Sequence, residues 1–460
     1  FWSANSFFIS WDIGSILYDI EKNFDFENPA KHLKDLILAY KKIQSLEDKH
    51  WRDIKEKQII QIIEACAGLY LEASSESSSA VPNDMLEVAI EVLNRNAEIP
   101  IFLESIGYKT EKTENISYDI LLENNIKQQF KKTINLEKLS YSDPYWLQTE
   151  GSLGMYNVNK RTLIGKPETP RKAVVFFNLL IDTTQLTIKK NIIHRYSKRD
   201  QGELYDPFEI VPLVTTKLND KVLLFSDANE QTVNVGVRSG ANNIKGKLFL
   251  DVPEEWKVTP TFIEIEIKQK GDTQTYPFKI TPTINDSEGV IKASVLVDGK
   301  KFDKELIEIK YDHIPKQTVL KKSEAKAVRL NIKKAGNFIG YIKGAGDLVP
   351  ESLKQIGYSV VMINPEEITN EHLRKFDAIV LGIRAYNTIP ILKYKQKFLL
   401  EYVKNGGNMV VQYNTSRRVD VAAPFKLNLS RDRVTDENAK VEILEKNHAV
   451  MNFPNKISEQ

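Results

Sequence analysis

Three short segments of the sequence each follow an apolar run and carry side chains that can bind a ligand. The three segments are Gly344-Ala345-Gly346-Asp347, Arg384-Ala385-Tyr386-Asn387 and Asn414-Thr415-Ser416-Arg417. The guanidinium of Arg384 can bind a carboxylate or phosphate through two parallel hydrogen bonds, and Tyr386 and Asn387 add a hydroxyl and an amide beside it. The alternative is structural, with Arg384 paired to an acidic neighbour and Tyr386 packed beneath it.

The glycine segment has a simpler interpretation than ligand binding. Gly344 and Gly346 allow the backbone to turn sharply, and Asp347 can cap the free N–H groups of a following helix. A dinucleotide-binding fingerprint needs a third glycine and a later acidic residue, and neither is evident here. The sequence therefore favours a tight strand-to-helix turn at this position.

Other kinds of catalytic or metal site find little support. The six histidines show no HxH, HxxH or HExxH spacing. Asp200, Glu203 and Asp206 lack a full set of calcium ligands, and a salt bridge with Arg199 is the favoured interpretation. The sequence has no Gly-x-Ser-x-Gly, and the single cysteine, Cys66, falls on the apolar side of a predicted helix, where cysteine is usually inert.

The elements that would position the first three segments follow Pro315. Apolar runs of strand length are found at 338–343, 358–363, 377–383 and 408–413, and amphipathic stretches at 349–356 and 391–404 lie between them. Alternation of buried strands and helices predicts a doubly wound α/β domain with a parallel sheet. Because ligands of such sheets bind beyond the carboxyl ends of the strands, we expect any ligand site there. The predicted ligand-binding residues are Gly344, Gly346, Asp347, Arg384, Tyr386, Asn387, Tyr413 and Asn414.

The preceding residues divide into a helical and a β-rich part. Apolar residues at steps of three and four predict helices at 30–43 and 51–71, the serine-rich stretch Ser74–Ser79 is predicted to be an exposed loop, and residues 1–140 are assigned as a mainly helical region. Short β-branched segments then predict a β-rich module at 141–220 and an Ig-like β-sandwich at 221–314, followed by the α/β domain at 315–460. Trp256 is expected to plug the edge of a core, and His313 to fix the hinge to the last domain.

The composition excludes several classes of protein. A length of 460 residues predicts about three domains. A formal charge of +2 argues against nucleic acid as a partner, and no uncharged apolar run reaches the roughly 20 residues of a membrane-spanning helix. The start at Phe1 and the lack of a further strand and helix after Pro454 lead us to expect a piece of a longer chain, with a truncated last domain.

Several blocks together resemble a known family. The blocks are Ser142-Asp143-Pro144-Tyr145-Trp146-Leu147, Arg199-Asp200-Gln201-Gly202-Glu203 with Pro207 and Val211-Pro212, Tyr311-Asp312-His313-Ile314-Pro315, residues 339–347, residues 377–387 and Arg433-Val434-Thr435-Asp436-Glu437. Their order and spacing are similar to those of the large multidomain proteins of the LmbE-like (PIG-L) N-acetylglucosaminyl deacetylase family. The resemblance covers most of the chain after about residue 140.

The resemblance implies a carbohydrate deacetylase as the parent protein, with this chain as its accessory part. In that family a zinc ion held by a His-Pro-Asp-Asp type motif activates water against an N-acetyl group, and no such motif occurs in these 460 residues. We therefore expect no catalytic residue, metal ligand or cofactor in this chain. Zinc is expected only in the catalytic domain of the parent protein. The last domain is expected to be similar to class I glutamine amidotransferases, without their cysteine.

Three functional hypotheses follow. The first is a non-catalytic region that binds a glycan or other domains of the same parent chain. The second is that the α/β domain is itself an enzyme with an unorthodox site around Asp347, Arg384 and Tyr413. The third is a structural scaffold. The resemblance also predicts an extracytoplasmic location.

Overall fold

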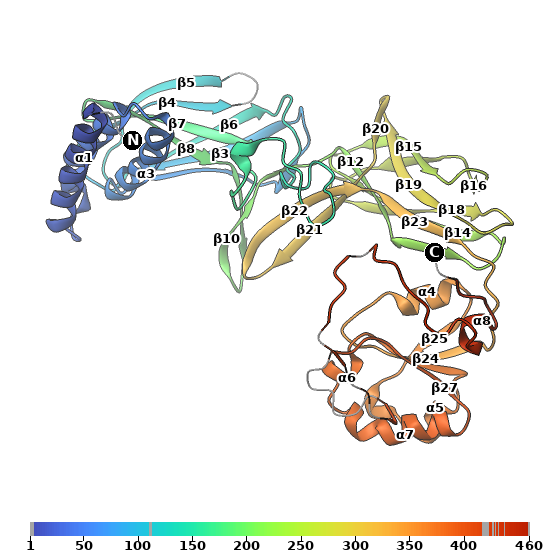
Figure 1. Ribbon diagram of the computed structural model, residues 1–460. Coiled ribbons are helices and arrows are strands. Elements are labelled where there is room, and N and C mark those ends of the chain that lie inside the picture. The colour runs from blue at the N-terminus through green and yellow to red at the C-terminus, as the bar shows by residue number, and fades with distance from the viewer. Residues whose placement is uncertain are drawn as a thin grey trace.

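The computed structural model describes residues 4–109, 113–415, 423–425, 427, 429–430, 432–436 and 438–458. These residues form three units that follow one another along an elongated molecule (Figure 1). The first unit combines helices with β-sheets, the second is a β-sandwich, and the third has helices around a parallel sheet. The predicted multidomain architecture with β-sandwich modules is therefore confirmed. No described helix has the length and apolar character needed to cross a membrane.

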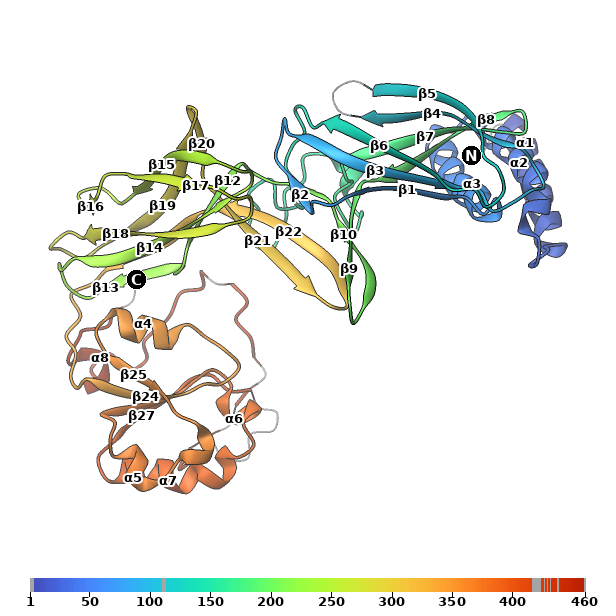
Figure 2. The same cartoon turned by 180° about the vertical axis from the view of Figure 1, so that it is seen from behind.

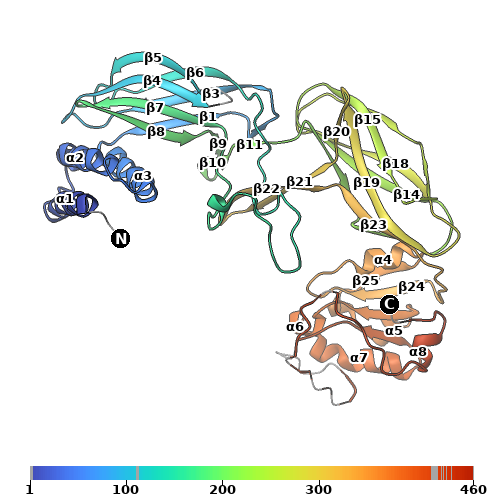
Figure 3. The ribbon, with the colours of Figure 1, turned by 45° about the horizontal axis from the view of Figure 1, so that its top comes forward.

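The first unit begins with three helices, α1 (Ala4–Lys22), α2 (Leu33–Gln44) and α3 (Lys49–Cys66), with a 3-10 turn, η1 (Pro29–His32), before α2. The amphipathic pattern at 30–43 correctly predicts α2, whose apolar stripe is buried. The carboxylate of Asp48 starts α3 by accepting hydrogen bonds from the backbone N–H groups of His50 and Trp51. Figure 3 shows the three helices along one side of the strands of this unit.

Two mostly antiparallel sheets complete the first unit and share one hydrophobic core with the helices. The first sheet has the strand order β10-β9-β1-β3-β6 and the second β5-β4-β7-β8. The strands are β1 (Tyr70–Ser75), β3 (Met85–Leu93), β4 (Ile101–Lys109), β5 (Thr113–Leu121), β6 (Gln128–Asn135), β7 (Val174–Ile181), β8 (Thr184–Asn191), β9 (Ile193–Lys198) and β10 (Gly202–Pro207). A short parallel pair, β2 (Ser79–Ala80) and β11 (Glu209–Ile210), lies beside them, and the long β6–β7 loop contains the 3-10 turn η2 (Arg161–Leu163).

The prediction of a mainly helical region at 1–140 is wrong from Tyr70 onward, where six strands replace the expected helices. In β1 five of the six side chains are buried, so the strand lacks the alternation that distinguishes a half-exposed strand from a helix. The first core also runs from Ile20 to Ile210, so the expected boundary near 140 falls inside one unit.

The serine-rich stretch at 74–79 is not the exposed loop that its composition predicts. Ser74 and Ser75 end β1 and are buried, and Ser79 begins β2. Only Glu76 in this stretch is well exposed. Small hydroxyl side chains fit a crowded strand end as well as a loop, so composition alone does not separate the two.

The second unit is a β-sandwich with its own core, which begins at Val214 rather than near the expected residue 221. One sheet has the order β12-β14-β18-β16 and the other β13-β23-β19-β15-β17, with β20 paired to β19. Trp256 is buried as expected, packs edge-on against Phe225 and donates from Nε1 to the Ser287 hydroxyl at 3.1 Å. The strands are β12 (Val214–Leu218), β13 (Val222–Phe225), β14 (Gln231–Ser239), β15 (Ile244–Asp251), β16 (Lys257–Thr259), β17 (Ile263–Ile267), β18 (Thr273–Thr281), β19 (Ser287–Val297), β20 (Lys300–Phe302) and β23 (Glu324–Arg329).

A two-stranded hairpin, β21 (Lys304–Tyr311) and β22 (Ile314–Lys322), extends from the second unit toward the first (Figure 2). His313 lies in the turn of this hairpin, and the chain then returns to the sandwich as β23. The predicted hinge at His313 and the boundary at 315 are therefore wrong. The third unit starts at β24, after residue 337.

The third unit contains a parallel sheet of order β25-β24-β26-β27, with the apolar runs of the sequence as its strands. Helix α4 faces β13 of the second unit, where the Gln355 amide accepts from Leu224 N at 2.8 Å and donates to Val222 O at 3.3 Å. Helices α5 and α7 lie on the opposite side of the sheet (Figure 1). The elements are β24 (Phe338–Ile342), α4 (Val349–Gln355), β25 (Ser359–Met362), η3 (Pro365–Glu367), α5 (Asn370–Leu373), β26 (Ala378–Leu381), α6 (Ala385–Thr388), α7 (Leu392–Lys404), β27 (Asn408–Val411) and α8 (Ala449–Asn452).

Candidate functional site

Asp347 lies at the carboxyl end of the parallel sheet, but its carboxylate is occupied by the protein itself. Oδ1 accepts from the Tyr341 hydroxyl at 2.6 Å and from Val349 N at 3.0 Å, and Oδ2 accepts from Ile383 N at 3.3 Å. These contacts join the loop after β24 to the start of α4 and to the loop after β26. Asp347 therefore holds the sheet edge together and has little capacity left for a ligand.

Gly344 is required by the close approach of two loops. A Cβ at this position would collide with the carbonyl oxygen of Ile383 and lie 2.9 Å from Ala385 N. Gly346 has a positive φ of 116°, which favours glycine. Both glycines thus serve the tight turn, which agrees with the structural interpretation of this segment.

Sequence reasoning missed the hydroxyl beneath this turn. Tyr341 is fully buried in β24, and its hydroxyl donates to Asp347 and accepts from Gln412 Nε2 at 2.8 Å. The pKa of Tyr341 is raised well above its ordinary value. Burial is the larger cause, and the hydrogen bond to Asp347 is the next. Tyr341 therefore stays protonated and acts as a fixed donor. Its position as the fourth residue of an apolar run gave no sign of this role.

Tyr386 and Asn414 also belong to the framework of the sheet edge. The buried Tyr386 hydroxyl donates to Gln396 Oε1 at 2.5 Å, and burial raises the pKa of Tyr386 to about 12. Asn414 accepts from Tyr386 N at 3.2 Å and donates to Gln412 O at 2.9 Å. Neither phenol nor amide is free to recognise a ligand.

Asn387 contributes a backbone-like pairing between two loops. Its Oδ1 accepts from Thr415 N at 2.9 Å, and its Nδ2 donates to Thr415 O at 3.2 Å. The loop after β27 is therefore fixed to α6 at this point. Ser416 and Arg417, the rest of the third predicted segment, lie outside the described residues.

Arg384 differs from its neighbours because its backbone is fixed and its side chain is exposed. It occupies the N-cap of α6 in a left-handed conformation with φ 58°, and its N–H donates to Tyr413 O at 2.7 Å. Within the part of the chain that the structure describes, no carboxylate forms an ion pair with Arg384. The alternative of a structural ion pair therefore has no partner among these residues.

A cleft of about 1250 Å³ opens beside Arg384, between α6, α7, β27 and the described residues 423–425, 427, 429–430 and 432–433. Of the eight predicted site residues, Arg384, Asn387, Tyr413 and Asn414 line it, whereas Gly344, Gly346, Asp347 and Tyr386 do not. Tyr413 is 66% exposed, and the apolar wall includes Leu400. Asp432 and Arg433 also line the cleft and carry opposite charges, so Arg384 gives the lining its excess positive charge. Together with the accessible phenol of Tyr413 and the apolar wall, this excess suits an anionic group attached to an apolar or ring-shaped body.

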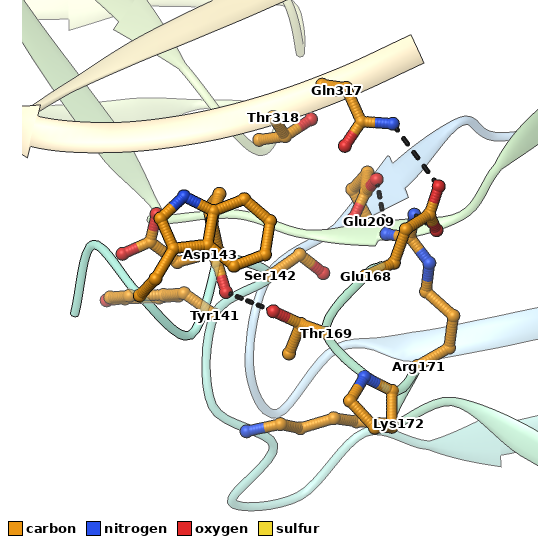
Figure 4. A pocket seen from close by; sticks show the side chains of 13 residues that line it. Tyr141, Ser142, Asp143, Glu168, Thr169, Arg171, Lys172, Glu209, Gln317 and Thr318 are labelled. Carbon is orange, nitrogen blue, oxygen red and sulfur yellow. Dashed lines mark hydrogen bonds and ion pairs between the residues drawn. The ribbon is translucent and has the colours of Figure 1, made fainter. Parts of the chain in front are cut away.

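A second group of polar side chains lies where the first unit meets the hairpin, around a cavity of about 30 Å³ (Figure 4). The block Ser142–Leu147 of the sequence forms part of its wall. Ser142 Oγ accepts from Ile210 N at 2.9 Å, and Asp143 Oδ1 accepts from Leu320 N of β22 at 3.1 Å. Burial raises the pKa of Asp143, because the charged form is partly desolvated. The Asp143 contact fastens the hairpin to the first unit, whereas the Ser142 contact holds the loop against β11 within that unit.

Glu209 and Arg171 form the buried ion pair of this group, and neither was singled out from the sequence. Glu209 is 1% exposed, and its Oε1 lies 2.6 Å from Arg171 Nη1. Arg171 Nη2 also contacts Glu168 Oε2 at 3.2 Å, and Glu168 Oε1 accepts from Gln317 of β22. Because Arg171 and Glu209 are 38 residues apart, local spacing carries no signal for their contact.

The acidic cluster at 200–206 is divided between other partners. Glu203 Oε2 lies 4.0 Å from Arg195 Nε, and Asp206 Oδ2 lies 3.9 Å from Lys310 Nζ of the hairpin. The expected pairing with Arg199 is therefore replaced by these two contacts. Among the described residues, no group of three or more histidine, cysteine, aspartate or glutamate side chains is arranged to hold a metal ion.

No protein-family model and no curated protein matches this sequence. Solved structures with some similarity include Escherichia coli alpha-2-macroglobulin activated by porcine elastase, with 12% identity over 57% of this chain and 22% of that chain and a TM-score of 0.19. Red sea bream transglutaminase shares 11% identity over 61% of this chain and 34% of its own, with a TM-score of 0.23. The D0-D1 domain of intimin shares 10% identity over 56% and 97%, with a TM-score of 0.16. Similarity at this level does not indicate a shared function.

Proposed function

We propose that this chain is a non-catalytic accessory region of an LmbE-like (PIG-L) N-acetylglucosaminyl deacetylase, and that its α/β unit binds an acidic group of a glycan or protein partner through Arg384. The order and spacing of the sequence blocks described above support the family assignment. The parallel sheet with order β25-β24-β26-β27 supports similarity of the last unit to class I glutamine amidotransferases. The observation that carries the binding role is the exposed Arg384 guanidinium beside the cleft.

The geometry at Arg384 favours binding over covalent catalysis. A sharp turn from strand to helix with a left-handed residue is where some hydrolases hold their nucleophilic serine. Here that position follows β26 and precedes α6, and an arginine occupies it. A guanidinium remains protonated in proteins and does not attack a substrate, but it binds oxyanions well. Because Asp347 is already engaged by three donors, an enzymatic site built on Asp347, Arg384 and Tyr413 receives less support.

Arg384→Ala should weaken binding of an acidic ligand by about 1.5–3 kcal/mol, the usual contribution of a hydrogen bond to a charged group. Arg384→Lys should restore only part of the affinity, because an ammonium cannot form the paired hydrogen bonds of a guanidinium. Calorimetry against a panel of amino sugars and acidic glycans measures both effects. Arg374→Ala is the matched control, since Arg374 is an exposed arginine of the same unit that does not line the cleft.

Three results would contradict the binding of an acidic glycan through Arg384. One is a panel in which no glycan binds, and another is equal affinity of the Arg384→Ala and Arg374→Ala variants. The third is a lower melting temperature of Arg384→Ala with unchanged affinity, which would assign Arg384 to the framework.

The purified chain should release no acetate from N-acetylglucosamine conjugates, with or without added zinc, because it lacks the His-Pro-Asp-Asp type motif of the family. An acetate-release assay combined with elemental analysis tests this expectation. Stoichiometric zinc together with acetate release would show that the chain carries a deacetylase site of its own.

A further inference from the structure

A cavity of about 250 Å³ lies at the junction of the first and second units, apart from the Arg384 cleft. Its walls come from the β2–β11 pair of the first unit, from the end of β14, and from the β21–β22 hairpin. Figure 2 shows β2, β21 and β22 gathered at this junction. With about 30 Å³ per water molecule, the space corresponds to about eight waters, which is enough for a small ring-shaped molecule.

Two of the cations that line the cavity share a single carboxylate. Arg238 Nη1 lies 2.8 Å from Glu308 Oε2, and Lys316 Nζ lies 2.7 Å from Oε1 of the same glutamate. Burial alone would raise the pKa of Glu308, but the hydrogen bonds from Lys316 and Arg238 lower it overall. Glu308 is therefore ionised and fully engaged.

Lys270 is the third cation, and its partners are uncharged. Its ammonium donates to Ser77 Oγ at 2.7 Å and to the carbonyl oxygen of Ser79. In the described part of the chain, Lys270 forms no ion pair. Burial lowers its pKa, although the field of Asp84 acts in the opposite direction. Asp84 acts on Lys270 only at a distance, so among the described residues no carboxylate directly contacts this partly buried ammonium.

Glu209 is a second polar group of the lining with an unmet need, because one of its oxygens has no hydrogen-bond donor. Arg171 neutralises this buried carboxylate at Oε1, but Oε2 is buried without a hydrogen-bond partner. An unsatisfied buried acceptor is costly, and a ligand hydroxyl can supply the missing donor. The cavity lining therefore contains three cations, Arg238, Lys270 and Lys316, and two carboxylates. Glu308 pairs with two of these cations, whereas Glu209 pairs with Arg171, which is not in the lining, and keeps one oxygen without a donor.

We propose that this junction cavity binds an acidic monosaccharide, such as a hexuronate, with its carboxylate on Lys270 and its hydroxyls directed to Glu209. The carboxylate of the sugar would neutralise the excess positive charge of the lining. Its hydroxyls would donate a hydrogen bond to the unpaired oxygen of Glu209. The serine and threonine side chains of the wall offer further hydrogen bonds. The proposal does not depend on Arg384, which belongs to a different unit.

Calorimetry with glucuronate, glucose, acetate and sulfate tests the assignment. Glucuronate should bind, and glucose and acetate should each bind at least about tenfold more weakly, because each offers only one of the two required groups. Lys270→Met should reduce the affinity for glucuronate at least about tenfold. Lys268→Met is the control, since Lys268 is exposed and does not line the cavity.

Hydrogen–deuterium exchange of the unchanged protein locates the site even if Lys270→Met fails to fold. Glucuronate should slow exchange at 77–80 and 314–318 and leave 378–387 unaffected. The proposal is overturned if glucuronate does not bind, if it protects only 378–387, or if Lys268→Met and a folded Lys270→Met bind it equally. Binding of sulfate or acetate as tight as that of glucuronate would reject the sugar assignment.

Discussion

Replacing Arg171 by alanine should lower the free energy of unfolding of the first unit by about 3–5 kcal/mol. The side chain of Glu209 is 2% exposed, and Arg171 at 2.6 Å is its ion-pair partner. Without the guanidinium, the carboxylate would remain buried, and neither of its oxygens would have a side-chain donor or a countercharge. Urea unfolding followed by intrinsic fluorescence measures the change, with the transitions of the separate units resolved.

The double variant Arg171→Ala, Glu209→Gln separates the loss of a charge partner from the loss of packing. A neutral amide costs less to bury than an unpaired carboxylate, so the second substitution should recover a large part of the lost stability. Arg161→Ala is the surface control, because Arg161 is exposed in η2, and it should stay within about 0.5 kcal/mol of the parent protein. Equal destabilisation by Arg171→Ala and Arg161→Ala would show that the buried pair is not the source of stability.

The second large effect is expected at Tyr341. Tyr341→Ala should destabilise the α/β unit by about 3–5 kcal/mol, the usual cost of removing a large buried ring. The ring is fully buried in β24, and its hydroxyl is bonded to Asp347 and Gln412. Thermal and urea unfolding of the variant measure the change.

Tyr341→Phe keeps the ring and removes only the hydroxyl. It should cost about 1–3 kcal/mol, because Asp347 loses a donor inside the protein. Tyr394→Ala is the control, since Tyr394 is 73% exposed on α7 and should have little effect. If Tyr341→Ala and Tyr394→Ala unfold alike, the proposed role of Tyr341 in the sheet edge is wrong.

The sequence predicts an element well in two cases. In one, the element buries only one face; in the other, turn residues delimit its apolar run at both ends. Helix α2 exposes one face and buries the other, so its apolar residues repeat at helical spacing. The four strands of the parallel sheet are short apolar runs, and turn residues separate them from helices. Because parallel strands gather their ends at one edge, the placement of Arg384 beside a cleft also follows from the sequence.

Contacts between distant residues account for most of what the sequence does not predict. Strand β1 is buried almost throughout, so it carries no periodic signal. The segment at His313 resembles a linker, but it is the turn of a hairpin because β22 pairs with β21. At the sheet edge, Tyr386 turns inward toward Gln396, and a pattern of neighbouring polar residues cannot show which of them does so.

The contact between α4 and β13 has a consequence for the solubility of the molecule. Strand β13 is the outermost strand of its sheet, and such strands expose N–H and C=O groups that can pair with another copy of the chain. The Gln355 amide binds Leu224 N and Val222 O with one acceptor and one donor, as the backbone of a neighbouring strand would. The α/β unit therefore covers an edge that would otherwise be open to intermolecular strand addition and aggregation.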